Sequence, residues 1–179
     1  MGVREDFSDD EWFLLSSTPA MIAAAMSSAA PSGVIGTIKE MTAGMRSTVQ
    51  GRERHADSEL ITALLEKAEN WDAAKEKAKD YRERSRARLE GAGIESREQL
   101  HEQVLADCRE AMRLVDERCG AADAAAYRDW SVGVAREVAE AAKEGGFLGF
   151  GGERVSDEER AMLGRIETAL GAPSGVLQA

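Results

Sequence analysis

The chain has 179 residues, of which 43% are hydrophobic and 31% charged, and its formal net charge is −10. This length suits one domain with its own core, and the composition is too apolar for a disordered chain and too charged for a membrane-embedded one. The acidic balance disfavours a chain-wide nucleic-acid interface, because phosphate binding needs an excess of Lys and Arg on one face.

The first predicted helix begins at Ser8, because Ser8 is followed three residues later by Glu11 in the pattern of a capping box. Pro19 lacks an N–H, which predicts a kink or restart, and the segment 20–26 that follows is apolar on every side. We expect that segment in the middle of a bundle. The uncharged run 13–38 is long enough to cross a membrane, but its many Ser, Thr, Pro and Gly residues favour a buried core helix followed by a turn.

Two further helices are predicted before residue 90. The apolar spacing over 34–49 indicates a shorter helix, with Gly51 marking its end. A strong amphipathic pattern then starts at Asp57, and no Gly or Pro interrupts it before Glu90, which predicts one long helix. The apolar stripe of this helix consists of Leu60, Ile61, Leu64, Leu65, Ala68 and Trp71.

The second half of that helix is highly charged. Twelve of the 19 residues from 72 to 90 carry a charge, so no core can enclose them. The segment 91–93 (Gly-Ala-Gly) should reverse the chain, and Ser96 should cap a return helix. The sequence therefore predicts a charged antiparallel helical hairpin arm over about 72–100. The acids interleaved with its Lys and Arg residues favour a solvated face over a phosphate-binding one.

The return helix carries both cysteines of the chain, Cys108 and Cys119. Eleven residues of helix separate them by about 16 Å, which is too far for an intrachain disulfide. Reduced thiols are typical of a cytosolic protein, and the N-terminal residues show no export signal or lipid-anchor motif. We therefore expect a cytoplasmic location.

Two helices are predicted in the C-terminal third. The first runs over about 121–144, and the second starts at the capping box of Ser156 and Glu159 and ends near Leu170. The tail 172–179 should be frayed. No segment alternates apolar and polar residues as a half-buried strand would. The predicted fold is all-α, a single domain over 1–179 with a bundle of about six helices and the protruding hairpin arm.

The loop between those two helices is the most unusual local feature of the sequence. Its residues are Gly145, Gly146, Phe147, Leu148, Gly149, Phe150, Gly151 and Gly152. Glu153 follows where a phosphate-binding loop would have Lys, so a phosphate site is disfavoured. Two interpretations stay open: the apolar side chains plug the end of the bundle, or they form an exposed loop for a partner or for self-association.

Catalytic and metal-binding patterns are sparse. A bundle di-iron site needs two Glu-x-x-His motifs, and only Glu98 with His101 has that spacing, since the other histidine, His55, is preceded by Glu53. The two cysteines and two histidines lack the spacing of a zinc site, and no nucleophile signature occurs. We predict no enzyme activity and no cofactor, and whether acidic side chains bind a metal stays open.

Two resemblances concern the ends of the chain. The segment 141–152 with Val155, Ser156 and Glu159 resembles an uncharacterised family of small bacterial all-α proteins with a KEGGFLGFGG…VSxxE signature, and the segment 32–40 looks similar to that family's other signature. Glu153, Val155, Ser156 and Glu159 also resemble a turn of tellurite-resistance TerB-type helical domains, although the Asp-Gly of that turn is not present before Glu153. Both resemblances imply a helical fold.

These observations favour a non-enzymatic interaction or scaffold protein that binds a protein partner or self-associates as a homo-oligomer, without nucleic acid. One alternative is a TerB-like stress protein that binds a metal or a small ligand, based on the acidic excess and the TerB-like turn. The other is a peripheral membrane protein that uses Phe147, Leu148 and Phe150.

Overall fold

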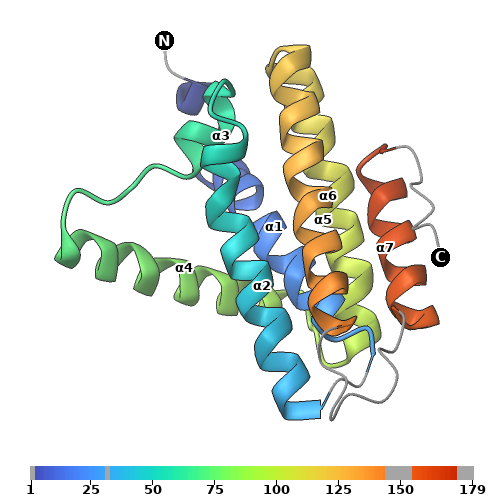
Figure 1. Cartoon of the computed structure of the whole chain (residues 1–179). Helices are drawn as coiled ribbons and strands as arrows, with labels where there is room; N and C mark the ends of the chain where they lie inside the picture. The colour runs from blue at the N-terminus through green and yellow to red at the C-terminus, as the bar shows by residue number, and fades with distance from the viewer. Residues whose placement is uncertain (1–2, 31–32, 144–154, 173–179) are drawn as a thin grey trace.

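The computed structural model describes residues 3–30, 33–143 and 155–172, and these ranges contain helices and no strand (Figure 1). The elements are η1 (Val3–Asp6), α1 (Asp9–Ser27), α2 (Gly33–Arg54), α3 (Glu59–Leu64), α4 (Trp71–Gly91), α5 (Arg97–Arg118), α6 (Ala121–Lys143) and α7 (Asp157–Ala169). The predicted all-α class and the bundle of about six helices are confirmed. Within the described ranges, no helix is both apolar enough and long enough to cross a membrane.

The predicted helix starts agree with the structure because short-range hydrogen bonds set them. At the start of α1 the Glu11 amide donates to Ser8 Oγ at 3.3 Å, and the Ser8 amide donates to Glu11 Oε2 at 2.8 Å. Ser156 and Glu159 form the same capping box before α7, and Ser96 caps α5. Each pair satisfies backbone donors that the first helical turn leaves free.

The core lies where α1 meets α2, α5 and α6. Leu15, Ile22 and Met26 of α1 are fully buried, as are Tyr127 and Val134 of α6. The segment 20–26 is not buried on every side, because Ala24 is exposed. Helix α1 is therefore central in the bundle, but one of its faces remains open.

Helix α1 also continues through Pro19 without restarting. A proline at this position leaves the carbonyl oxygen of Leu15 without its usual intrahelical donor. The Tyr127 hydroxyl on α6 donates to that oxygen at 2.9 Å. A side chain of a neighbouring helix thus replaces the missing backbone donor.

The prediction of one long helix over 57–90 is wrong. Helix α3 ends at Leu64, and α4 begins at Trp71 after Asn70, whose Oδ1 accepts a hydrogen bond from the Ala73 amide at 2.9 Å. The apolar stripe is buried only in α3, and Trp71 is 74% exposed although the pattern placed it in the core. The chain leaves the bundle after α3 because α4 has no apolar face to bury.

The charged arm differs from the predicted arrangement as well. Gly93, with φ +64°, turns the chain between α4 and α5 as expected. However, α4 lies crosswise to the bundle with its N-terminal end projecting, and it does not run antiparallel along α5 (Figure 1). Its C-terminal half therefore contacts α1 and α5 where it crosses them.

Helix α2 is longer than predicted, because Gly51 lies inside it and not at its end. A Cβ built on Gly51 would lie 2.5 Å from Trp130 Cδ1, and one on Gly44 would lie 2.5 Å from Ala23 Cβ. These two glycines allow α2 to pack closely against α6 and α1. Trp130 fills the space beside Gly51 and donates from Nε1 to the Thr48 carbonyl oxygen at 3.2 Å.

Candidate interaction groove

A groove runs between α2 and α4, with α3 and the segment 65–70 at one end. Its volume is about 830 Å³. The wall on α4 consists of Ala74, Lys77, Ala78, Tyr81 and Arg82, and the opposite wall includes Val49, Arg52, Glu53, Leu64 and Leu65. The groove exists because α4 crosses the bundle without packing along α2.

A second hollow of about 400 Å³ adjoins the first, between α1 and α2. Small side chains form much of its floor, among them Ala20 and Ala24 of α1, and Met45 of α2 borders it. Val49 and Tyr81 line both hollows, so the two are neighbours. We call the combined surface the α4 groove.

The α4 groove contains two of the three large hydrophobic side chains that are exposed in the described residues. Met45 is 68% exposed and Val49 is 65% exposed, and Trp71 of α4 is the third. Met45, Val49 and Arg52 are spaced i, i+4, i+7, so they form one stripe of α2 beside the stripe that packs through Gly44 and Gly51. Exposed apolar side chains that lie together on a concave surface are typical of a binding site.

The rim of the α4 groove is mainly cationic. Arg52, Lys67, Lys77 and Arg82 line it, together with the carboxylates Glu53 and Glu66. Lys77 Nζ donates to the Glu66 carbonyl oxygen at 2.9 Å, and Arg52 donates to the Leu65 carbonyl oxygen at 3.4 Å. Within the described part of the chain, none of the four cations forms an ion pair. Their charges are available to a ligand, in a chain whose net charge is −10.

The C-terminal half of α4 is attached to the bundle by aromatic and ionic contacts. The rings of Tyr81 and Phe13 are 5.6 Å apart, and the Arg84 guanidinium lies 4.4 Å from the centroid of the Phe13 ring. Arg88 pairs with the buried carboxylate of Asp107 on α5 at 2.5 Å. Burial raises the pKa of Asp107, while Arg88 opposes this shift. No residue of α4 is buried, so these contacts hold the helix in place while its N-terminal half stands off the bundle.

The two cysteines are free thiols whose pKa values are raised by burial. Cys108 is buried on α5, and burial raises its pKa to about 12. Burial also raises the pKa of Cys119, the residue that ends α5, to about 11. Both thiols are protonated at neutral pH, and a protonated thiol is a poor nucleophile and metal ligand.

One contact between polar side chains was not foreseen from the sequence. Ser28 Oγ at the end of α1 lies 2.9 Å from His101 Nε2 on α5, and 73 positions separate the two residues. A serine beside a histidine is also the arrangement of an activated nucleophile. The Ser28 hydroxyl also donates to the Ala25 carbonyl oxygen of its own helix, at 3.0 Å. The pair therefore connects the end of α1 to α5.

The remaining predicted site residues fall into two groups. The candidate interaction loop, Gly145 to Gly152, lies outside the described residues, as do Glu153 and most of the tail. Val155 is buried, and Ser156 and Glu159 of the TerB-like pattern are engaged in the capping box of α7. Across 3–30, 33–143 and 155–172, no three His, Cys, Asp or Glu side chains are grouped so that they could hold a metal ion. Glu98 and His101 therefore belong to no such group among the described residues.

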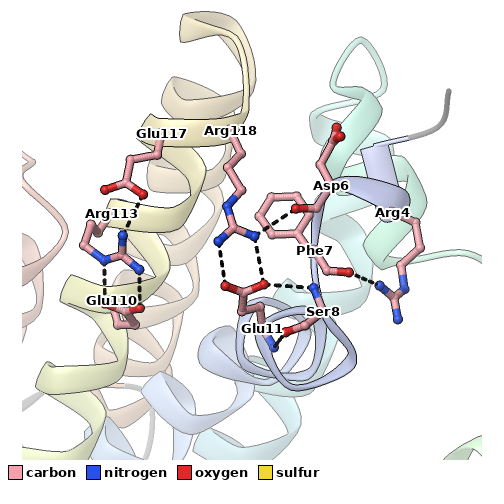
Figure 2. A network of polar contacts seen from close by, with 9 residues as sticks. All are labelled: Arg4, Asp6, Phe7, Ser8, Glu11, Glu110, Arg113, Glu117 and Arg118. Carbon is pink, nitrogen blue, oxygen red and sulfur yellow. Dashed lines mark hydrogen bonds and ion pairs between the residues drawn. The ribbon is translucent and has the colours of Figure 1, made fainter.

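A polar network joins η1, α1 and the end of α5 (Figure 2). Arg118 donates to both carboxylate oxygens of Glu11, at 2.7 and 2.8 Å, and to the Asp6 carbonyl oxygen at 2.8 Å. Its guanidinium lies 5.4 Å from the centroid of the Phe7 ring. The hydrogen bonds from Arg118 and from the Ser8 amide lower the pKa of Glu11 to about 2. This network fixes the start of α1 to the end of α5.

We expect the Glu11 contact to make stability depend on pH in a defined window. The pKa of Glu11 is about 2 in the folded protein, below its ordinary value of 4.5, so its contribution to stability is fully present above pH 4.5 and is lost as the pH falls toward 2. The difference in unfolding free energy between the wild type and Glu11→Gln should therefore shrink over this window in urea titrations. Glu5→Gln is the control, because Glu5 forms no hydrogen bond or ion pair with other described residues. An unchanged difference would contradict the assignment.

Comparison of the chain with protein-family models, with curated proteins and with solved structures gave no match.

Proposed function

We propose that this chain is a non-enzymatic interaction protein that binds a partner protein through the α4 groove. The observation that carries this proposal is the exposure of Met45 and Val49 on the floor of that groove, at 68% and 65%. Burying apolar surface stabilises a complex by roughly 25 cal/mol per Å² before the costs of association. The groove offers such surface without unfolding any part of the bundle.

The architecture around the groove supports a binding role over a purely structural one. Among the described residues, the buried hydrophobic cluster includes Leu15 and Ile22 of α1 and Val134 of α6, but neither Met45 nor Val49. Helix α4 contributes no buried residue to that core. Its ordered position across the bundle therefore creates the groove rather than completing the fold.

The partner bound in the α4 groove can also be a second copy of the chain, since the sequence also predicts self-association. A photoreactive amino acid at Val49 should give a discrete crosslinked product in the cells that make the protein. The same photoreactive amino acid in place of Ala125, which is exposed on α6, is the matched control and should give no discrete crosslinked product. A product of two copies of the chain identifies self-association through the groove, and a product with another protein identifies a partner.

The crosslinking result has a second control within the groove itself. Met45→Glu places a carboxylate beside Val49 without touching the core, so it should reduce the Val49 product while the helical content stays unchanged. Equal labelling from Val49 and Ala125, or a Val49 product that ignores Met45→Glu, would refute the proposal.

A further inference from the structure

We propose that the occupant of the α4 groove is an acidic amphipathic helix of a partner protein, an inference that rests on the proposed function and specifies its ligand. Three features of the described residues lead to it: the spacing of the apolar floor, the charge of the rim and the small side chains of α1.

The floor matches the apolar face of a helix. Met45 and Val49 lie one turn apart on α2, and Tyr81 faces them across the groove from α4. Helices that bind in grooves insert apolar anchors at i, i+3 or i+4, and i+7. Ala20 and Ala24 on α1 leave room for those anchors, because their side chains end at Cβ.

The rim selects a negative ligand. Arg52, Lys67, Lys77 and Arg82 line the larger hollow, next to Val49 and Tyr81, and the carboxylates that line it with them are Glu53 and Glu66. In the described part of the chain most other arginines are already engaged by carboxylates, as Arg118 is by Glu11. Carboxylates along the polar edges of a docked helix would pair with these cations at the border of the apolar contact, where such pairs set specificity and the rate of association.

The same rim argues against a second copy bound face to face. In a two-fold dimer through the α4 groove, both copies contribute the same surface, so each would bring the same excess of cations to one interface. Like charges at an interface destabilise it. An acidic partner therefore complements the charge of the α4 groove better than a second copy of this chain does.

The test uses a fluorescent amphipathic peptide of about five helical turns, with Leu at the anchor spacing and Glu at the other surface positions. Its anisotropy should rise on titration with the full chain, and the affinity should fall as salt is added. A peptide with Lys in place of Glu should bind at least tenfold more weakly. Equal binding of the two peptides would overturn the acidic specificity.

Variants locate the binding site. The double variant Lys77→Glu and Arg82→Glu should weaken binding of the acidic peptide about tenfold or more, a loss of about 1.4 kcal/mol per factor of ten. Arg109→Glu is the matched control, because Arg109 is exposed on α5 away from the groove, and it should leave the affinity unchanged. Circular dichroism of each variant confirms that the helical fold is retained.

The outcomes separate this inference from the proposed function. Suppose that Met45→Glu abolishes peptide binding while the double variant Lys77→Glu and Arg82→Glu has no more effect than Arg109→Glu. In that case the groove is a binding site, but the cations of its rim do not select an acidic ligand. If neither peptide binds at any salt concentration, the acidic-helix inference is wrong, while the crosslinking experiment still tests the proposed function independently. If vesicles of phosphatidylglycerol and phosphatidylcholine displace the acidic peptide and carry the protein on flotation, the surface binds lipid and the inference is overturned.

Discussion

Replacing Gly51 with alanine should lower the free energy of unfolding by about 1–3 kcal/mol, although alanine is the better helix former. The added Cβ would lie 2.5 Å from Trp130 Cδ1, closer than carbon atoms approach one another. Trp130 is buried and its indole N–H is bonded to the Thr48 carbonyl oxygen, so the ring has no free space to enter. Helices α2 and α6 are in extensive contact, and α2 would have to move away from α6 to make room for the added Cβ.

The measurement is urea unfolding followed by circular dichroism, with two glycine controls inside helices. A Cβ at Gly133 of α6 or Gly164 of α7 would meet no atom within 4 Å. Replacing either by alanine should raise the free energy of unfolding by up to about 1 kcal/mol, because only the helix propensity changes. Opposite signs for Gly51→Ala and Gly164→Ala are the expected result. If Gly51→Ala also stabilised the protein, the close packing of α2 on α6 would be refuted.

Replacing Tyr127 with phenylalanine should cost about 1–3 kcal/mol, because the carbonyl oxygen of Leu15 would then be buried without a donor. The hydroxyl is the donor at 2.9 Å, and Tyr127 is fully buried. The volume of the side chain hardly changes, so a cavity contributes little to the loss. Unfolding by urea measures the effect.

The Pro19→Ala background isolates the cause of that cost. Alanine at position 19 restores a backbone N–H that can donate to the Leu15 carbonyl oxygen within α1. The cost of Tyr127→Phe should therefore be smaller in Pro19→Ala than in the wild type, and a double-mutant cycle measures the difference. An identical cost in both backgrounds would mean that the hydroxyl does not substitute for the missing backbone donor.

Local patterns predicted the starts of α1, α5 and α7 and the central face of α6 correctly. The Glu three residues later identifies Ser8 and Ser156 as caps, and the turn at 91–93 identifies Ser96 as one; such hydrogen bonds depend only on neighbouring backbone. Tyr127 and Trp130 were placed on one apolar stripe, and both are buried. These predictions succeeded because helix periodicity determines which side chains share a face.

The break between α3 and α4 was missed because nothing in its sequence stops a helix. The segment 65–70 contains no Gly or Pro, and the residues on both sides of it form helices. The break arises since α3 buries Leu60, Ile61 and Leu64 against the bundle, while the charged residues of α4 require water. Competition between these two environments is a tertiary effect, so propensity alone does not reveal it.

By itself the sequence determined which segments become helices, where most of them begin, and which side of each is apolar, because those properties depend on neighbours within a few residues. Only the tertiary structure decided that Gly51 is a packing position for Trp130, that Tyr127 serves the carbonyl freed by Pro19, and that α4 crosses the bundle. The α4 groove follows from that crossing. The floor and the rim of the groove come from separate helices. No local pattern predicts the groove, because the packing of all helices together sets the orientation of each one.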